Sequence, residues 1–518
     1  MHGLVLDAPG SPAEEATLAA LLRCCVREVA GPRGLVWPAP PYVLLRVGGV
    51  LLRARARGGA ALRFDGPPER LAAGAWCPLT SDELVRLVER ELSAAGGNEE
   101  FAGQVAASRQ AVAAILQARA GAVPPVDPWL ASEQALVFGH PFHPSPKARG
   151  GDRWLRYAPE AHAEFPVRLL GVRADVLAEE GDTAALDLMG EAPPGYRLLP
   201  VHPWQLDLLR PALGAELVDL GDGPPVVPTS SVRTVYAPAA ATCLKFSLDV
   251  RITNCVRKNA WYELAGAVEL TARLGPVFKE VASRFPGTRW LAEPGYRSAR
   301  LGTRLLEGLG VIVRESPWSV CSPGVVPVLA GALAAGGAST SAVRRDPLGW
   351  WSAYVSAVAP PVLELFFAHG VILEPHLQNV LVGLDDEGMP REAVFRDLEG
   401  TKLVAGRHDL AGVPEPVARA MTYDAARGWA RVVYCLLVNH LTEIAATVAA
   451  PGGDELLREL WRAARGILAR QAGELGRPEP LSELLAGAPL PAKANLGVRW
   501  ARAADRAAGY VPIANPLA

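Results

Sequence analysis

The feature of this sequence that most constrains its fold is an apolar run interrupted by four polar side chains. The run reads VILEPHLQNVLV over residues 371–382, and Glu374, His376, Gln378 and Asn379 stand inside it. The Val, Ile and Leu on its flanks are typical of buried β-strands. A buried polar group without a hydrogen-bond partner costs about 1–3 kcal/mol. The fold must therefore supply hydrogen bonds, a metal ion or a bound ligand at this point.

The residues that follow this run predict a β-hairpin. The turn sequence GLDDEGMP leads to a second apolar segment that ends in RDLEG and contains Asp397. Because the two strands are similar in length, the hairpin returns Asp397 close to Asn379. Their oxygens would suit a Mg²⁺ ion that also binds nucleotide phosphates, which His376 would face. A structural alternative fits this stretch alone equally well: His376 and Gln378 cap a neighbouring strand, and DDEG is a solvated turn.

A basic segment lies upstream, in PTSSVRTVYAPAAATCLKFSLDVRITNCVRKN at residues 228–259. Its alternating pattern predicts a β-hairpin with one buried face. Lys245 stands between Leu244 and Phe246, where a lysine is seldom placed unless an anion meets it. One face would present cations and hydroxyls to a polyphosphate or a carboxylate, and the alternative is a solvated basic edge. The residues concerned are Ser231, Arg233, Thr234, Lys245, Thr253, Asn254, Arg257 and Lys258.

A third cluster, GHPFHPSPKARGG at residues 139–151, is kept out of helix and sheet by its prolines and glycines. It contains His140, His143, Lys147 and Arg149. Two histidines can bind zinc, but no carboxylate or thiol has a suitable spacing, and Lys147 and Arg149 would repel a cation. We therefore expect an anion here. The sequence PVHPWQ adds His202, which fits a packed turn with a satisfied core histidine equally well.

Composition indicates a large globular protein that binds small molecules. With 518 residues, half of them hydrophobic, the chain exceeds the size of one core and predicts two or three domains. A net charge of −2 and a pI near 6.5 give no surplus of basic residues for nucleic acid or an anionic membrane. No membrane-length apolar run and no secretory leader are evident, so we expect a cytoplasmic protein. The seven cysteines include no C-x-x-C pair, which predicts reduced packing residues.

The hydrophobic periodicity divides the chain into regions of different structure. Residues 13–117 are Ala- and Leu-rich with helical spacing, interrupted by the hairpin-like segment YVLLRVGGVLLRARA, and the Pro-rich break GAVPPVDPW follows. The last third predicts long amphipathic helices, with short strands only near residues 371–384 and 393–398. These patterns favour an α+β fold class.

Five blocks together resemble a known family, the siderophore synthetases that work independently of nonribosomal peptide synthetases, of the aerobactin-synthetase type. The blocks are GHPFHPSPKARGG, PVHPWQ, PTSSVRT, KFSLDVRITNCVR, and EPHLQNVL with its trailing RDLEG. They span residues 139 to about 400, in the order of the family. The resemblance implies a three-lobed, cupped-hand architecture. It comprises a helical N-terminal lobe with a small sheet (residues 1–125), a central antiparallel-sheet lobe (126–345) and a mostly helical, loosely kinase-like C-terminal lobe (346–518).

The resemblance also implies an enzymatic activity, that of an AMP-forming ligase. The family uses ATP and Mg²⁺ to adenylate a carboxylate of a polycarboxylic acid, usually citrate, and passes the acyl group to an amine or hydroxyl acceptor. Homodimers are common in it. Carried over by position, the residues that would hold ATP are Ser231, Arg233 and Thr234. Those that would contact the α-phosphate are Lys245, Arg257 and His376. Thr253 would lie beside the carboxylate. Likewise Gln378, Asn379, Asp397, Glu374 and Glu399 would serve Mg²⁺ and ATP, and His143, Lys147 and Arg149 would hold the acid.

The sequence departs from the family pattern in two places. The N-terminal lobe is lean, which leaves the surface for the acyl acceptor open. The C-terminal part is distantly related to ferric-siderophore reductases, but it lacks their cysteine cluster, so we do not expect reductase activity.

Two other functions compete with ligation. The H-x-x-N pattern followed by an Asp also resembles aminoglycoside-type phosphotransferases, which would release ADP, but their catalytic Asp before the Asn is missing. A non-catalytic siderophore-binding or scaffold protein has no need for the set Lys245, Arg257, His376, Asn379 and Asp397. The substrate's own carboxylate attacks in adenylation, so the absence of a G-x-S-x-G elbow or reactive cysteine is expected.

Overall fold

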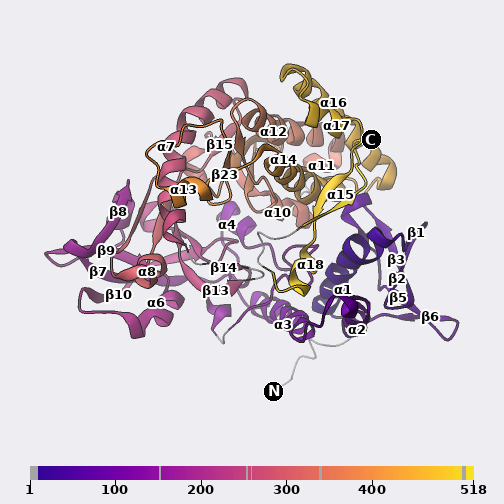
Figure 1. Ribbon diagram of the computed structural model, residues 1–518, viewed down its shortest axis with the longest axis horizontal. Coiled ribbons are helices and arrows are strands. Elements are labelled where there is room, and N and C mark those ends of the chain that lie inside the picture. Colours follow the sequence, from indigo (N-terminus) through magenta and orange to yellow (C-terminus); the bar gives the residue numbers. More distant parts are fainter. Residues whose placement is uncertain (1–9, 151–152, 253–254, 258, 338–340, 504–508) are drawn as a thin grey trace.

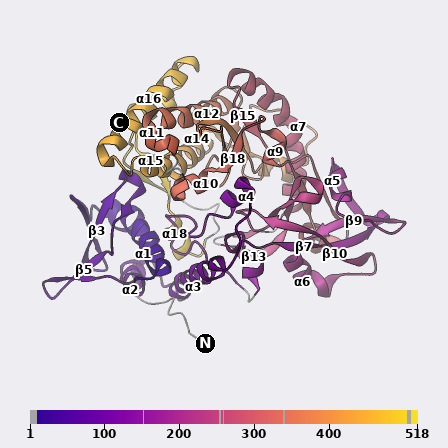
Figure 2. The same cartoon turned by 180° about the vertical axis from the view of Figure 1, so that it is seen from behind.

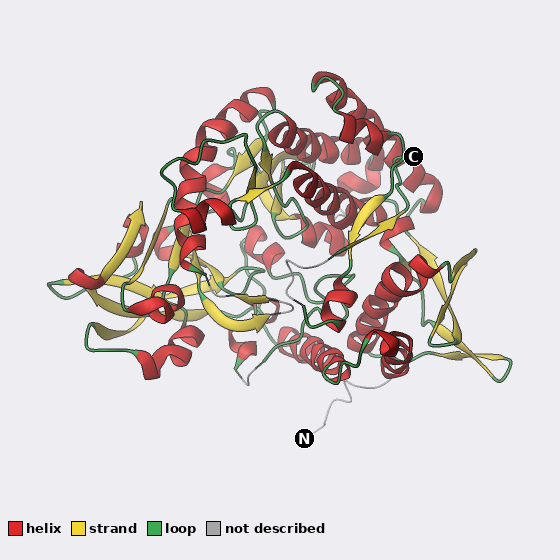
Figure 3. Cartoon of the chain, in the orientation of Figure 1, coloured by secondary structure: helices red, strands yellow, loops and turns green. Residues whose placement is uncertain are grey.

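Figure 1 shows three lobes arranged as an arch, with the N-terminal lobe and the strand-rich lobe at its two ends and the C-terminal helices across the top. The computed structural model describes residues 10–150, 153–252, 255–257, 259–337, 341–503 and 509–518. The view from behind shows the same order of lobes (Figure 2). Helices dominate the top of the arch and strands its sheet-rich end (Figure 3). The predicted α+β class with three lobes is confirmed.

The N-terminal lobe packs three helices against a small sheet, as predicted. The β-hairpin expected around Gly48 and Gly49 is present, because Val47 pairs with Val50 and both glycines have positive φ angles, as a two-residue hairpin turn requires. The helices are α1 (Pro12–Cys24), α2 (Ser81–Leu92) and α3 (Phe101–Ala120). The strands are β1 (Val36–Ala39), β2 (Tyr42–Val47), β3 (Val50–Arg57), β4 (Arg63–Phe64), β5 (Glu69–Ala72) and β6 (Ala75–Pro78).

The central lobe is built on an eight-stranded antiparallel sheet. Its order is β8 (Leu177–Gly181), β16 (Gly295–Ala299), β17 (Val311–Arg314), β12 (Thr242–Phe246), β11 (Thr234–Ala237), β10 (Leu217–Pro228), β7 (Phe165–Arg173) and β9 (Tyr196–Val201). The predicted hairpin within 228–259 is confirmed, since Thr234 pairs with Lys245 across β11 and β12. A second hairpin joins β13 (Leu248–Ile252) to β14 (Cys255–Arg257). Thr253, Asn254 and Lys258 lie outside the described residues.

The helices of this part of the chain pack partly on this sheet and partly on strands and helices of the next lobe. They are α4 (Pro128–Glu133), α5 (Ala184–Asp187), α6 (Pro203–Leu209), α7 (Trp261–Arg284), α8 (Gly302–Gly308), α9 (Pro317–Val320), α10 (Ala330–Ala332) and α11 (Ser341–Arg345).

The C-terminal lobe contains a four-stranded sheet that draws on both halves of the chain. Its order is β15 (Thr288–Trp290), β21 (Pro390–Phe395), β20 (Val380–Leu384) and β18 (Val326–Leu329). Because β15 and β18 precede residue 345, the expected boundary there does not separate the two sheets. The hairpin β20–β21 has the predicted turn, and the backbone N–H of Arg396 donates to the carbonyl of Asn379 at 3.1 Å. A three-stranded sheet of β19 (Val371–Ile372), β22 (Lys402–Val404) and β23 (Thr422–Tyr423) lies beyond it.

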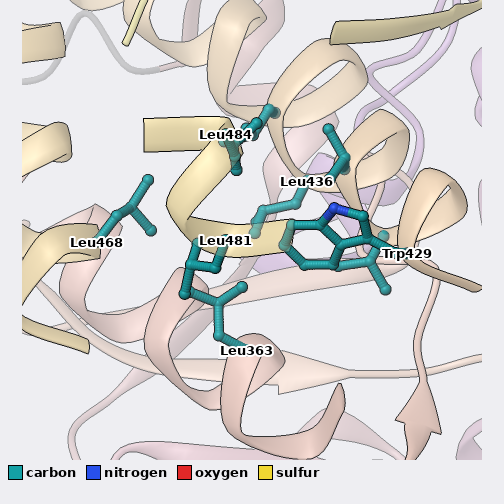
Figure 4. A pocket seen from close by; sticks show the side chains of 9 residues that line it. Leu363, Trp429, Leu436, Leu468, Leu481 and Leu484 are labelled. Atoms are coloured by element: carbon teal, nitrogen blue, oxygen red, sulfur yellow. The ribbon is translucent and has the colours of Figure 1, made fainter. Parts of the chain in front are cut away.

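The largest hydrophobic core lies among the helices of this lobe. They are α12 (Pro347–Phe367), α13 (Glu415–Ala420), α14 (Ala425–Val433), α15 (Thr442–Val448), α16 (Gly453–Glu474) and α17 (Glu479–Leu485), with a π-helical stretch at Tyr434–Leu441 between α14 and α15. A small apolar cavity of about 10 Å³ lies among α12, α14, α16 and α17. Figure 4 shows Leu363, Trp429 and Leu481 in its wall. Its size and apolar lining exclude it as a substrate site.

The end of the chain returns to the N-terminal lobe, which the sequence did not predict. Helix α18 (Asn495–Trp500) buries Leu496 and Trp500 in the core of that lobe, and the Trp500 ring lies 5.4 Å from that of Phe101. Figure 1 shows α18 beside α1. Strands β24 (Leu490–Lys493) and β25 (Tyr510–Ile513) flank α18 and also lie outside the two regions where strands were expected in the last third.

Two predictions drawn from composition can be compared with the structure. The six described cysteines are free thiols, four of them buried, as expected for packing residues. None of the described helices is both long and apolar enough to cross a membrane.

Candidate functional site

Lys245 is a buried cation that meets three carboxylates. It lies on β12 with 1% of its surface exposed. Its Nζ is 2.7 Å from Oδ1 of Asp397, 3.2 Å from Oε2 of Glu399 and 3.6 Å from Oε1 of Glu293. Burial alone would lower the pKa of Lys245, but these carboxylates raise it above its usual value, so the ammonium stays charged. The alternative of a solvated basic edge is therefore excluded for this residue.

Arg314 and Glu293 complete this cluster and were not identified from the sequence. Arg314, at the end of β17, donates from Nε to Oε1 of Glu293 at 2.7 Å and from Nη2 to Oδ1 of Asp397 at 2.9 Å. Glu293 is fully buried. Two cations and three acidic groups thus share one site, in which Lys245, Arg314 and Glu293 are buried, so that the electrostatic interactions among them are strong. The one feature of the sequence that could have indicated Arg314 is its position as a single charged residue at the end of the apolar segment GVIVR.

Asp397 holds an uncommon backbone conformation just after β21. Its φ is +76°, a left-handed geometry that costs a residue with a Cβ about 1–2 kcal/mol. Burial alone would raise its pKa, but Lys245 and Arg314 hold the pKa well below the usual range, so the carboxylate is ionised. Both ion pairs use Oδ1; among the described residues Oδ2 accepts no hydrogen bond. One oxygen of an ionised carboxylate is therefore available to a ligand.

The polar residues inside the apolar run lie in a loop between β19 and β20. Asn379 is 6% exposed, and its side-chain amide makes no hydrogen bond within the described part of the chain. The Gln378 amide donates to the carbonyl of Ser230 at 2.9 Å. His376 accepts from the backbone N–H of Gln378 through Nδ1 at 3.2 Å, and burial lowers its pKa. His376 thus bonds within its own loop, whereas Gln378 reaches the loop at Ser230 in the central lobe, and the side-chain amide of Asn379 has no hydrogen-bond partner among the described residues.

The other two acidic residues predicted for the metal are held by arginines. Glu374 accepts from Nε of Arg431 at 2.7 Å, and Glu399 forms an ion pair with Arg233. Burial alone would lower the pKa of Arg233, but Glu399 and Asp397 raise it. Both carboxylates are thus tied to cations, as Asp397 is, whereas the side-chain amide of Asn379 is not.

The serine-rich loop before β11 carries the residues predicted for the nucleotide. Thr229 Oγ1 donates to the carbonyl of Thr234 at 2.8 Å, and Val232 has a φ of +64°, which makes the loop tight. Ser231 is half-buried at its tip, and Thr234 Oγ1 lies 3.5 Å from Ser231 Oγ. Arg233 donates to Oδ1 of Asn259 as well as to Glu399. The structure thus brings Arg233, Lys245, Asp397 and Glu399 into one cluster.

The histidine-rich loop at 139–151 is anchored by buried contacts. Lys147 is 4% exposed and forms an ion pair with Glu160, which is also buried. Burial alone would raise the pKa of Glu160, but Lys147 lowers it, so the pair is ionic. His143 accepts from the backbone N–H of Ser145 through Nδ1 at 3.1 Å. The acid-binding roles of His143, Lys147 and Arg149 stay predictions.

This loop contacts the π-helical stretch Tyr434–Leu441, which also supports the loop before Asn379. Nδ2 of Asn439 lies 2.9 Å from Nε2 of His140, and its Oδ1 accepts from the backbone N–H of Leu377 at 3.1 Å. Burial lowers the pKa of His140 to about 3, so the ring is neutral. The π-helical stretch thereby ties the two histidine-bearing loops together, a use that fits the frequency of such turns at functional sites.

His202 is a core histidine, as one of the two sequence interpretations proposed, but it is not fully satisfied, because its buried Nε2 has no hydrogen-bond partner among the described residues. It is fully buried, accepts from the backbone N–H of Trp204 at 3.2 Å at the start of α6, and packs its ring against Tyr157 and Phe165. Burial lowers its pKa to about 3.

The residues present fit a magnesium ion that takes most of its ligands from phosphates and water. The described residues contain no group of three or more His, Cys, Asp or Glu that could hold a metal by themselves. Mg²⁺ needs few protein ligands when a nucleotide is bound, and it prefers hard oxygens. The free oxygen of Asp397 and the amide oxygen of Asn379 are oxygens of this kind.

The chain is similar to several known proteins. Residues 128–335 match the IucA/IucC family, and residues 349–508 match the family described as ferric iron reductase FhuF-like transporter. A protein of Rhizobium meliloti, "Rhizobactin siderophore biosynthesis protein RhbC", is 29% identical over 84% of each chain. The Staphylococcus aureus L-2,3-diaminopropanoate–citrate ligase is 32% identical over 65% of each chain. The structure of ATP-bound aerobactin synthetase IucA from Klebsiella pneumoniae superposes with a TM-score of 0.80 at 22% identity, covering 97% of this chain and 99% of that one.

The chain belongs to the IucA/IucC family of siderophore synthetases. The resemblance seen in the five sequence blocks is confirmed. The part of the synthetase that matches the FhuF-like family contains one cysteine, Cys435, which is too few for a cysteine-ligated iron–sulfur cluster.

Proposed function

We propose that this synthetase uses Mg-ATP to adenylate a carboxylate of citrate, or of a related polycarboxylic acid, and transfers the acyl group to an amine or hydroxyl acceptor. The observation that carries the proposal is the meeting of Lys245 and Arg314 with Asp397, beside the free amide of Asn379. The S. aureus relative is named for joining citrate to an amine, which supports the same class of substrates here. Consumption of ATP fits the expected cytoplasmic location.

The first half-reaction requires fixed positive charge. An oxygen of the substrate carboxylate attacks the α-phosphorus, and the bond from that phosphorus to pyrophosphate breaks. Two anions approach each other, so cations held in a site of low dielectric stabilise the charge that develops. Lys245, Arg314, Arg233 and Arg257 would supply this charge, and His376, which burial keeps neutral, would donate a hydrogen bond to a phosphate oxygen.

The nucleotide and metal would be held by groups from both sheets. Ser231, Arg233, Thr234 and Gln378 would bind ATP, and Asn379 and Asp397, with Glu374 and Glu399 behind them, would hold Mg²⁺. When bound, the metal neutralises phosphate charge and orients the phosphates for in-line displacement. Asp397 stays ionised for this role because Lys245 and Arg314 keep its pKa low.

The second half-reaction needs no protein nucleophile. The acceptor nitrogen or oxygen attacks the acyl carbon, the bond to AMP breaks, and the acceptor loses a proton. Thr253, His143, Lys147 and Arg149 would orient the acid during both steps.

Detection of AMP tests this proposal. Purified synthetase is incubated with Mg-ATP, citrate and excess hydroxylamine, with citrate omitted as a control, and nucleotides are separated by chromatography. We expect AMP and a citryl hydroxamate, both lost in Asp397→Ala. The matched control is Asp386→Ala, which removes an exposed carboxylate from the turn of the same hairpin. Formation of ADP would overturn adenylation in favour of a kinase. Absence of ATP turnover with citrate and with other polycarboxylic acids would favour a non-catalytic role.

A further inference from the structure

Glu133 is a buried carboxylate that the proposed reaction does not use. It ends α4 and is fully buried. Its Oε1 accepts from Nε1 of Trp129 at 2.9 Å and from Arg396, and its Oε2 accepts from the backbone N–H of Ser230 at 3.2 Å and from Nη2 of Arg396 at 3.0 Å. Burial alone would raise its pKa, but Arg396 lowers it, so Glu133 is ionised. All of its hydrogen-bond partners other than Trp129 belong to segments that flank the nucleotide site.

Arg396 connects Glu133 to both of those segments. Its guanidinium donates to the carbonyl of Gln378 from Nε at 3.0 Å and from Nη2 at 2.7 Å, and to Oγ of Ser230 at 3.2 Å. Its backbone N–H donates to the carbonyl of Asn379. One side chain therefore holds the serine-rich loop, which comes from the central sheet, against the loop that carries Asn379.

Arg396 also directly precedes Asp397, the residue with the left-handed backbone. Such a conformation persists only where the surrounding structure holds it in place. Lys245 and Arg314 hold the side chain of Asp397, and Glu133 holds the residue before it. Without the Glu133 contact, Arg396 would lose its only charged hydrogen-bond acceptor among the described residues, and Ser230 would lose the carboxylate that accepts from its backbone N–H, so the two loops would be held together less firmly.

We propose that Glu133 and Arg396 are positioning residues for the nucleotide site: their ion pair sets the spacing between the serine-rich loop and the Asn379–Asp397 pair. Neither residue needs to touch the nucleotide. The pair acts through its hydrogen bonds to Ser230 and Gln378 and through the backbone of Asp397. Ser230 directly precedes the predicted ATP ligand Ser231, and Gln378 and Asp397 are themselves predicted ligands. This inference rests on the proposed function, because it assumes that the site binds Mg-ATP.

The test is Glu133→Gln, which keeps the shape of the side chain and removes its charge. We expect the Kd of Mg-ATP, measured by calorimetry without citrate, and the KM for ATP to rise by about 10- to 100-fold, the range for loss of a supporting contact. Glu133→Asp should recover part of the affinity because it restores the charge. If Glu133→Gln does not fold, Glu133→Asp serves as the test variant, with a smaller rise expected.

The matched control is Glu364→Gln. Glu364 is a buried carboxylate on α12 that pairs with Arg284 and accepts from Gln471, away from the predicted ligands. We expect it to lower the melting temperature but to leave the Kd of Mg-ATP within about twofold. A Glu133→Gln protein that melts early and binds Mg-ATP as tightly as the wild type would overturn the inference. If the wild type binds Mg-ATP but forms no AMP, the proposed reaction fails, and the binding constants still decide the role of Glu133.

Discussion

Nζ of Lys245 lies 2.7 Å from Oδ1 of Asp397, although 152 residues separate the two in the chain. Lys245 belongs to the eight-stranded sheet, and Asp397 follows a strand of the four-stranded sheet. Their contact, together with that of Arg314, joins the two sheets at the point where the serine-rich loop and the Asn379 loop meet. A buried ion pair adds little net stability once desolvation is counted. The pair therefore makes better sense as a preorganised part of a site for anions.

Loss of the Lys245 charge should impair adenylation much more than folding. In Lys245→Met, Asp397 still has Arg314 as its partner, so the fold is retained, but one cation that would face the phosphates is gone. We expect the rate of AMP formation to fall by about 10²- to 10³-fold, the usual cost of removing one stabilising group from a developing anion. Lys279→Met, at an exposed position on α7, is the control. A wild-type rate in Lys245→Met would remove this residue from the mechanism.

Asn379 allows metal binding to be tested separately from stability. Its side-chain amide has no hydrogen-bond partner among the described residues, so Asn379→Ala should change the melting temperature little. If the amide oxygen binds Mg²⁺, the metal concentration for half-maximal activity should rise by about 10- to 100-fold. Asn495→Ala is the contrasting variant, because its buried amide donates to the carbonyl of Phe142 at 3.0 Å. That variant should melt earlier and keep its metal requirement; the reverse pattern would argue against Asn379 as a ligand.

The alternation of apolar and polar residues along single strands was enough to predict which residues of the candidate site meet within one hairpin. The alternation around Lys245 predicted a buried cation, and the similar strand lengths placed Asp397 opposite the Asn379 loop. The approach of Glu293 and Arg314 depends on β17 pairing with β12, which is a long-range strand order that no local periodicity encodes. Glu133 on a short helix gave no signal, since its partners come from two distant segments.

The domain boundaries were harder to predict for a related reason. The family resemblance implied a boundary at residue 345, but β15 and β18 cross to the later sheet because their partners β21 and β20 lie there. In the same way α18 returns to the N-terminal lobe because Leu496 and Trp500 pack into its core, with the Trp500 ring against that of Phe101. Packing between segments decides both cases, and a single sequence shows it poorly.

Because the ring of His202 is buried, we expect the folded protein to lose stability in acid. Its pKa is about 3 in the folded protein and about 6.5 in the unfolded chain. Above pH 6.5 both states are neutral; as the pH falls below 6.5, the unfolded chain takes up a proton that the folded protein excludes until about pH 3. Stability from this group is therefore lost by about 1.4 kcal/mol per pH unit in that window.

The variant His202→Asn isolates this effect, since asparagine can also cap the start of α6 and does not titrate. Its cost in free energy of unfolding, measured with urea, should be largest at pH 7.5. We expect the cost to shrink by about 2 kcal/mol at pH 5, because only the wild type loses stability. An equal cost at the two pH values would show that the ring is not held neutral by burial.

Lys147 and Glu160 allow a structural role to be separated from substrate binding. Lys147→Met leaves the buried carboxylate of Glu160 without its cation, so the free energy of unfolding should fall by about 3–5 kcal/mol. The double variant Lys147→Met with Glu160→Gln removes both charges and should regain most of that loss.

The KM for citrate is then compared in the double variant and in Glu160→Gln alone. Direct contact with the acid predicts that KM stays raised in the double variant although stability has returned, since no cation is left to meet the carboxylate. A normal KM there would restrict Lys147 to anchoring its loop, and would leave His143 and Arg149 as the groups from this loop that bind the acid.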